Sequence, residues 1–129
     1  MNLKAPRTLA LLLLLTTVSA CAQKCPAPTA LEQIPRGDTA TFEQMAAAQH
    51  AVKAFDTATN VYIACLQRES DAELVKLEQR DIDPKKKEEQ KKKRVRALIK
   101  KQNAAVDVDQ ALAARFNEQL RVFKARDAE

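Results

Sequence analysis

The sequence predicts an all-α protein: an antiparallel two-helix coiled-coil hairpin with an extended N-terminal segment that is stapled to the first helix. Its 129 residues include one Gly, one Tyr and no Trp, and this composition favours helices over strands and turns. Apolar residues recur at alternating steps of three and four in two long stretches, the pattern of a coiled-coil seam. A break at residues 81–84 separates the two stretches. Two long helices joined by so short a turn should fold back on each other as a hairpin.

The first helix is expected over residues 41–80. Thr41 is followed three residues later by Gln44, which predicts a capping box, and Glu43 lies in the first turn, where the helix dipole favours an acid. The seam of this helix contains an eleven-residue step near its end, which locally unwinds a coiled coil. The seam residues are Met45, Ala48, Val52, Phe55, Thr59, Tyr62, Leu66 and Leu77.

The second helix is expected over residues 84–126. Asp83 is a good N-cap, and Pro84 suits the first helical position because it needs no hydrogen bond from its nitrogen. The predicted seam steps by four and three without a break. It consists of Val95, Ile99, Gln102, Val106, Asp109, Ala113, Phe116, Leu120 and Phe123.

Centring the turn on Ile82 predicts which residues of the two helices are neighbours. Phe42 should lie near Phe123 at one end of the hairpin. Tyr62 should lie near Gln102, and a hydrogen bond between these two polar-tipped residues would fix the register of an otherwise apolar seam.

Residues 21–40 are expected to be extended, because three prolines and the only glycine of the chain exclude a long helix there. A second apolar stripe flanks the seam of each helix, and a hairpin alone cannot cover faces that wide. The stripes are Ala51, Ala58, Cys65 and Ala72 in the first helix, and Leu98, Ala105 and Leu112 in the second. We therefore expect the extended segment to lie along the first helix. A homodimer formed through the same stripe is the alternative.

Residues 1–20 have the pattern of a cleavable secretion signal. Lys4 and Arg7 give a positively charged start, and the leucine run that follows is shorter than the roughly 20 apolar residues of a membrane-spanning helix. The next residues, Val18-Ser19-Ala20-Cys21, resemble the lipobox of bacterial lipoproteins, in which the cysteine is lipidated and becomes the new N-terminus. Ordinary signal cleavage after Ala22 is the alternative.

The cysteine count depends on the fate of Cys21. If Cys21 is acylated or removed, Cys25 and Cys65 remain, and two cysteines in an oxidising compartment most simply form one disulfide. A free Cys21 would leave one thiol over and favour pairing between chains. The alternative for Cys65 is a small buried apolar residue.

The strongest charge feature is a basic run near the predicted turn. Residues 68–101 contain thirteen cations and eight acids, a surplus of +5, whereas the rest of the chain after residue 20 carries −2. Seven cations are candidates for contact with an anionic surface such as lipid phosphate or a cell-wall polymer. They are Lys85, Lys86, Lys87, Lys91, Lys92, Lys93 and Arg94. The alternative is a solvated pair of helix ends joined by weak ion pairs.

The sequence offers little for catalysis, for a cofactor or for a metal. His50 is the only histidine and falls on the outer face of the first helix. Asp109 is a carboxylate on the apolar seam; we interpret it as a register-setting residue that reaches solvent or Lys53, with a ligand contact as the alternative. We expect no enzyme and no cofactor. Nucleic acid is not an expected partner, because no aromatic stacking residues accompany the lysines.

Several motifs are spread over most of the chain outside the lysine-rich part. They are Cys25-Pro26, Gln44-Met45-Ala46-Ala47-Ala48-Gln49, Val52-Lys53-Ala54-Phe55, Tyr62-Ile63-Ala64-Cys65-Leu66, Phe116-Asn117-Glu118-Gln119-Leu120-Arg121 and Phe123-Lys124. In these motifs the chain resembles a group of small exported helical proteins of Gram-negative bacteria. The resemblance implies export and a helical architecture, and it implies no particular activity.

These features predict an exported, lipid-anchored protein of the cell envelope that faces the periplasm from the outer membrane. It would act as a structural or protein-interaction module. The alternative is a soluble periplasmic chaperone-like binder whose basic helical tip holds anionic or unfolded clients. The expected partners are the membrane, through the lipid anchor, an envelope protein or anionic polymer, and a second copy of the chain.

Overall fold

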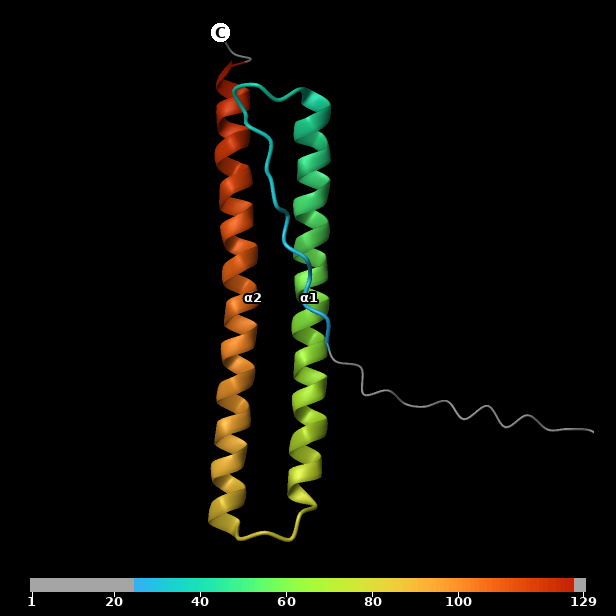
Figure 1. Ribbon diagram of the computed structural model, residues 1–129, viewed down its shortest axis with the longest axis vertical. Helices are drawn as coiled ribbons and strands as arrows, with labels where there is room; N and C mark the ends of the chain where they lie inside the picture. The colour runs from blue at the N-terminus through green and yellow to red at the C-terminus, as the bar shows by residue number, and fades with distance from the viewer. Residues whose placement is uncertain (1–24, 127–129) are drawn as a thin grey trace, which may run out of the picture.

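The computed structural model describes residues 25–126, which form two antiparallel helices and one extended segment (Figure 1). Helix α1 covers Phe42–Glu78 and helix α2 covers Pro84–Arg126. The predicted two-helix hairpin is confirmed, although α1 begins one residue later and ends two residues earlier than expected. The proposed signal and the lipobox cysteine lie outside the described residues.

Both helices begin with the caps that the sequence predicts. The Thr41 hydroxyl accepts a hydrogen bond from the Gln44 N–H at 3.2 Å, and the Gln44 side chain accepts one from the Thr41 N–H at 2.9 Å. At α2, one carboxylate oxygen of Asp83 accepts from the N–H groups of Lys85 and Lys86, at 3.0 and 3.2 Å. Each such cap contributes about 1 kcal/mol, so the sequence fixes where both helices start.

The apolar core is concentrated at one end of the hairpin, which we call the open end because the chain does not turn there. Its buried residues come from the segment and from both helices, so this half of the molecule has three layers. They are Ala40, Met45, Val52, Phe55, Leu112, Phe116 and Phe123, with Leu31, Ile34, Ala48 and Leu120 packed against them. Burial of each large apolar side chain stabilises the fold by roughly 1.5–3 kcal/mol. Within residues 25–126, the other half, towards the turn, consists of the two helices (Figure 1).

The extended segment crosses from α1 to α2 instead of following α1. It starts at the middle of α1 and reaches α2 near the open end (Figure 1), where the Gly37 N–H donates to the Gln119 side chain at 2.9 Å. A Cβ at Gly37 would lie 2.0 Å from the Gln119 carbonyl oxygen and 2.6 Å from the Phe123 nitrogen. Only glycine allows this backbone-to-backbone contact. The expectation that the segment follows the small residues of α1 is therefore wrong in part, and Ala58 remains exposed.

The last residue of α2 fastens the far end of the segment. Arg126 donates to the carbonyl oxygens of Ala40 at 2.9 Å and Asp38 at 3.4 Å. Its guanidinium also lies 4.7 Å from the centre of the Phe123 ring, a cation–π distance. The segment thus has polar contacts to α2 at two places: at Gly37, and at Ala40, two residues before α1 begins.

Along its turn half, α2 presents a different side to α1 than the sequence predicted. Three expected seam residues are substantially exposed: Val95 by 41%, Ile99 by 49% and Val106 by 37%. Instead, the residues assigned to the flanking stripe face inward, with Leu112 buried and Leu98 and Ala105 half-buried.

The side of α2 that faces α1 combines Leu98, Ala105 and Leu112 with Gln102 and Asp109 of the predicted seam. Ile99 follows Leu98 by about a quarter turn and therefore points away. This orientation brings Arg94 within 2.8 Å of Glu73 and pairs Lys91 with Glu78 across the hairpin. Near the turn, ion pairs between the helices thus accompany the buried Leu77.

The register of the hairpin agrees with the sequence at the open end. Phe42 lines one shallow groove together with Leu120 and Phe123, as the centred turn predicts. The predicted polar contact is wrong in detail, because Gln102 donates to Gln67 at 3.4 Å and not to the tyrosine about one turn earlier on α1.

Replacing Gly37 tests the close approach of the segment to α2. We expect Gly37→Ala to lower the free energy of unfolding by about 1–3 kcal/mol, because the new methyl group overpacks a site closed by the backbone. Urea unfolding followed by circular dichroism measures the change. Thr39→Ala, at an exposed neighbouring position, is the matched control and should change stability by less than about 0.5 kcal/mol. Equal effects of the two substitutions would contradict the contact.

Candidate functional site

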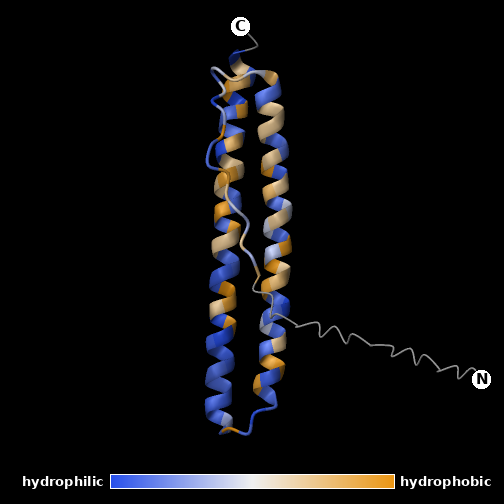
Figure 2. Ribbon diagram, turned by 45° about the vertical axis from the view of Figure 1, so that its right-hand side comes forward, coloured by the Kyte–Doolittle hydropathy of each residue, from blue (hydrophilic) through white to orange (hydrophobic). Residues whose placement is uncertain are grey.

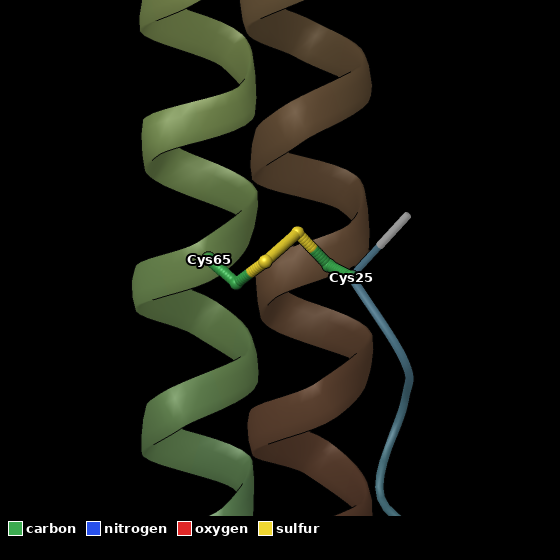
Figure 3. Close-up of a disulfide and its surroundings, with 2 residues drawn as sticks. All are labelled: Cys25 and Cys65. Atoms are coloured by element: carbon green, nitrogen blue, oxygen red, sulfur yellow. A yellow bond between two sulfur atoms is a disulfide. The ribbon is translucent and has the colours of Figure 1, made fainter. Parts of the chain in front are cut away.

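The Cys25–Cys65 disulfide joins the beginning of the described chain to the middle of α1 (Figure 3). The Cα atoms are 5.7 Å apart, and forty residues of sequence separate the two cysteines. Closing a loop of this length removes conformational entropy from the unfolded chain worth about 4 kcal/mol. The predicted pairing is confirmed, and it fixes the point at which the preceding chain enters the hairpin.

The basic residues near the turn fall into two groups. Four of the seven candidate cations are engaged by groups of the hairpin itself. Lys91 pairs with Glu78, Arg94 with Glu73 at 2.8 Å and Lys92 with Glu88 at 3.8 Å, while Lys87 donates to the Glu78 carbonyl oxygen at 2.9 Å. These contacts agree with the alternative interpretation, in which the helix ends near the turn are joined by ion pairs between cations and acids of the same protein.

The other three candidates, Lys85, Lys86 and Lys93, have exposed side chains and form no ion pair within residues 25–126. Figure 2 shows the turn half of α2 as mostly hydrophilic. These three lysines therefore contribute to the positive surplus near the turn.

The ion pairs across the hairpin change the pKa of the acids involved. Hydrogen bonds from Lys76 and then Arg94 lower the pKa of Glu73, and the hydrogen bond from Lys91 lowers the pKa of Glu78. The same contact with Glu78 raises the pKa of Lys91. Glu73, Glu78 and Lys91 thus keep their charges over a wider pH range, at a surface where each pair contributes at most about 1 kcal/mol.

Asp109 lies between the helices and faces another carboxylate. Its Oδ1 atom is buried without a hydrogen-bond partner in the described chain. Burial, and then the charge and hydrogen bonding of Asp56, raise the pKa of Asp109. Asp109 is half-buried and forms no ion pair with Lys53 in the described chain, so the predicted contact with Lys53 is wrong. Sequence reasoning missed Asp56, because its approach depends on the register between the helices.

The remaining polar candidates form no catalytic or metal-binding arrangement in residues 25–126. His50 is exposed on the outer face of α1, as expected, and the buried Thr59 hydroxyl has no hydrogen-bond partner among the described residues. No three His, Cys, Asp or Glu side chains of these residues gather closely enough to hold a metal ion.

Two shallow grooves run between the helices in the described chain, on opposite sides of the hairpin. One begins beside the disulfide and continues towards the turn. It is lined by Leu66, Glu69, Ser70, Glu73, Arg94, Ala97, Leu98 and Lys101. The other lies at the open end and is lined by Phe42, Met45, Ala46, Gln49, Phe116, Leu120, Phe123 and Lys124. Neither combines a nucleophile with a base, so contact with another surface is the chemistry that both offer.

Loss of the disulfide should destabilise the three-layered half of the protein. We expect Cys25→Ser with Cys65→Ser to lower the free energy of unfolding by about 4 kcal/mol, since the unfolded chain regains the entropy of a forty-residue loop. Urea unfolding compares this variant with the oxidised protein. The reduced wild-type protein is the control and should behave like the double variant; an unchanged midpoint in both would contradict a structural role for the bond.

The Asp109 carboxylate, one oxygen of which is buried, gives a pH dependence with a defined sign. The folded-state pKa of Asp109 lies above its ordinary value of 3.8, so its contribution to stability falls as pH rises from that value through the folded-state pKa. We expect Asp109→Asn to remove this loss and to stabilise the protein at neutral pH by about 1 kcal/mol, because the uncharged amide can donate to Asp56. Urea unfolding at acidic and neutral pH measures both effects. The exposed Asp107→Asn is the control; a larger gain there would refute the assignment.

Comparisons with protein-family models, with curated proteins and with solved structures find no match to this chain. Neither α1 nor α2 contains an apolar stretch long enough to cross a membrane. We therefore argue the function from the disulfide, from the segment that it holds and from the distribution of charge.

Proposed function

We propose that the protein is exported and held at a membrane of the cell envelope by lipid on Cys21, where it acts as a structural or protein-interaction module. The observation that carries the proposal is the Cys25–Cys65 disulfide. Such bonds persist in oxidising compartments such as the bacterial periplasm. Of three cysteines in the chain, the bond uses the two outside the lipobox-like sequence and leaves the one that a lipid would modify.

The arrangement of the described residues favours a contact role. At 1.5 Å per residue, α2 is about 65 Å long and forms one side of a thin rod. Most of the described residues are therefore close enough to the surface to contact a partner. The described grooves are shallow and lack a catalytic set, and unpaired lysines gather near the turn. Periplasm-facing attachment at the outer membrane is the location that we propose, with an anionic envelope component as the partner.

Fractionation of cells that make the wild-type protein or Cys21→Ser tests the anchor. We expect the wild-type protein in the membrane fraction with a mass increased by acyl chains, because several chains are needed for stable attachment. Cys21→Ser should move to the soluble periplasmic fraction while retaining the Cys25–Cys65 bond.

The matched control is Cys25→Ser, which removes a cysteine outside the lipobox and should leave the protein in the membrane. An unacylated wild-type protein, or a Cys21→Ser protein with an unchanged distribution, would overturn the anchor. Soluble wild-type protein in the periplasm would favour the chaperone-like binder.

A further inference from the structure

The disulfide limits how far the hairpin can stand from a lipid on Cys21. Only four residues of sequence lead from Cys21 to Cys25, and four extended residues span at most about 14 Å. Cys65, to which Cys25 is bonded, lies thirteen residues before the end of α1, or about 20 Å from the turn. The attachment point is thus on the side of the rod, not at an end.

One side of the hairpin faces the attachment point, and we call it the disulfide face. Glu69 follows Cys65 by one helical turn and therefore lies on the same side of α1. Glu69 lines the groove from α1, and Ala97 and Lys101 line it from α2. The nearby hydrogen bond between Gln67 and Gln102 puts Lys101 level with the disulfide.

A row of cations continues along this face from the disulfide towards the turn. Lys93 precedes Ala97 by one helical turn, and Lys86 precedes Lys93 by two, so both lie on the α2 edge marked by Lys101. All three lysines are exposed and form no ion pair within the described chain. The row extends about 22 Å, at 1.5 Å per residue.

The acids of the disulfide face do not cancel this row. Glu73 is already paired with both Lys76 and Arg94. Two acids without an ion pair in the described chain remain beside the three lysines: Glu69 across the groove, and Glu89, which lies between Lys86 and Lys93 on α2. The other edge of α2 has cations as well: Lys92 pairs with Glu88 there, whereas Lys85 and Arg96 are exposed and form no ion pair within the described chain. Both edges of α2 are therefore positive, and the disulfide decides which of them lies on the side of the attachment point.

We propose that the hairpin lies side-on along the membrane that holds its lipid, with the lysine row of the disulfide face docked on anionic phosphate headgroups. This inference rests on the proposed lipid anchor. The tether of at most about 14 Å is comparable to the Debye length of roughly 10 Å over which an anionic surface attracts, so it holds the disulfide end of the row near that range. The tether also keeps the turn within about 35 Å of the anchor, the sum of the 14 Å and 20 Å spans.

Vesicle flotation tests the docking face without the lipid. The mature chain, residues 21–129 with Cys21→Ser, contains every described contact and is mixed at low salt with two kinds of vesicle. One kind is phosphatidylcholine alone, and the other is equal parts phosphatidylcholine and phosphatidylglycerol. We expect binding to the anionic vesicles only. Lys86→Gln, Lys93→Gln and Lys101→Gln together should lower the partition coefficient about a hundredfold, at about fivefold for each lysine near the surface.

The matched control removes the same charge from elsewhere on α2. Lys85→Gln, Lys92→Gln and Arg96→Gln together should lower the partition coefficient less than about fivefold, because these side chains point away from the bilayer. Circular dichroism checks that both variants remain helical. Equal losses in the two variants would show attraction by net charge alone and would overturn the docking face, as would equal binding to both kinds of vesicle.

The outcome is independent of acylation. If Cys21→Ser is released in cells but the two triple variants bind alike, the anchor stands and the docking face is rejected. If the wild-type chain is unacylated but the disulfide-face variant alone loses binding, the anchor fails and the lipid-binding face stands.

Discussion

A covalent bond holds an extended segment on two helices that would otherwise expose much of their apolar surface. Fixing the backbone of each residue costs about 1–2 kcal/mol, and residues 25–40 recover little of this through backbone hydrogen bonds of their own. The Cys25–Cys65 bond retains the segment at one end. At the other end, Gly37 of the segment contacts α2, and Arg126 of α2 contacts the segment. Between these points Leu31 and Ile34 complete the core, so the three-layered half depends on the bond.

The two halves of the rod are stabilised by different interactions. The open end has an apolar core, whereas the turn half relies on a few contacts such as buried Leu66 and Leu77, on the Asp83 cap and on exposed ion pairs that contribute little individually. Stability should therefore decrease from the disulfide towards the turn, and this low-stability half carries the lysine row. A surface that adapts to a headgroup layer needs less rigidity than one that positions a catalytic group, so the division suits a contact function.

The sequence specified local features well and long-range ones less well. Helix starts follow from Thr41 and Asp83, because a cap is a contact within four residues. The disulfide followed from counting cysteines. The route of the segment could not be predicted, because the role of Gly37 depends on the α2 backbone against which it packs. Likewise, α2 carries two stripes with helical spacing, and the pattern alone cannot choose between Ile99 and Leu98; the lysine row could be recognised only after that choice had oriented α2.

The bond that stabilises the fold also sets the length of the proposed tether, and this connects stability with placement. With Cys25 bonded to Cys65, four residues separate the lipid from the hairpin; without the bond, the free chain would extend from Cys21 to Thr41. Twenty extended residues span up to about 70 Å, five times the constrained distance. Over such a tether the lysine row would spend most of its time beyond the range of the surface attraction. The side-on arrangement therefore follows from the disulfide as much as from the lysines, because the charge acts only where the bond holds it close.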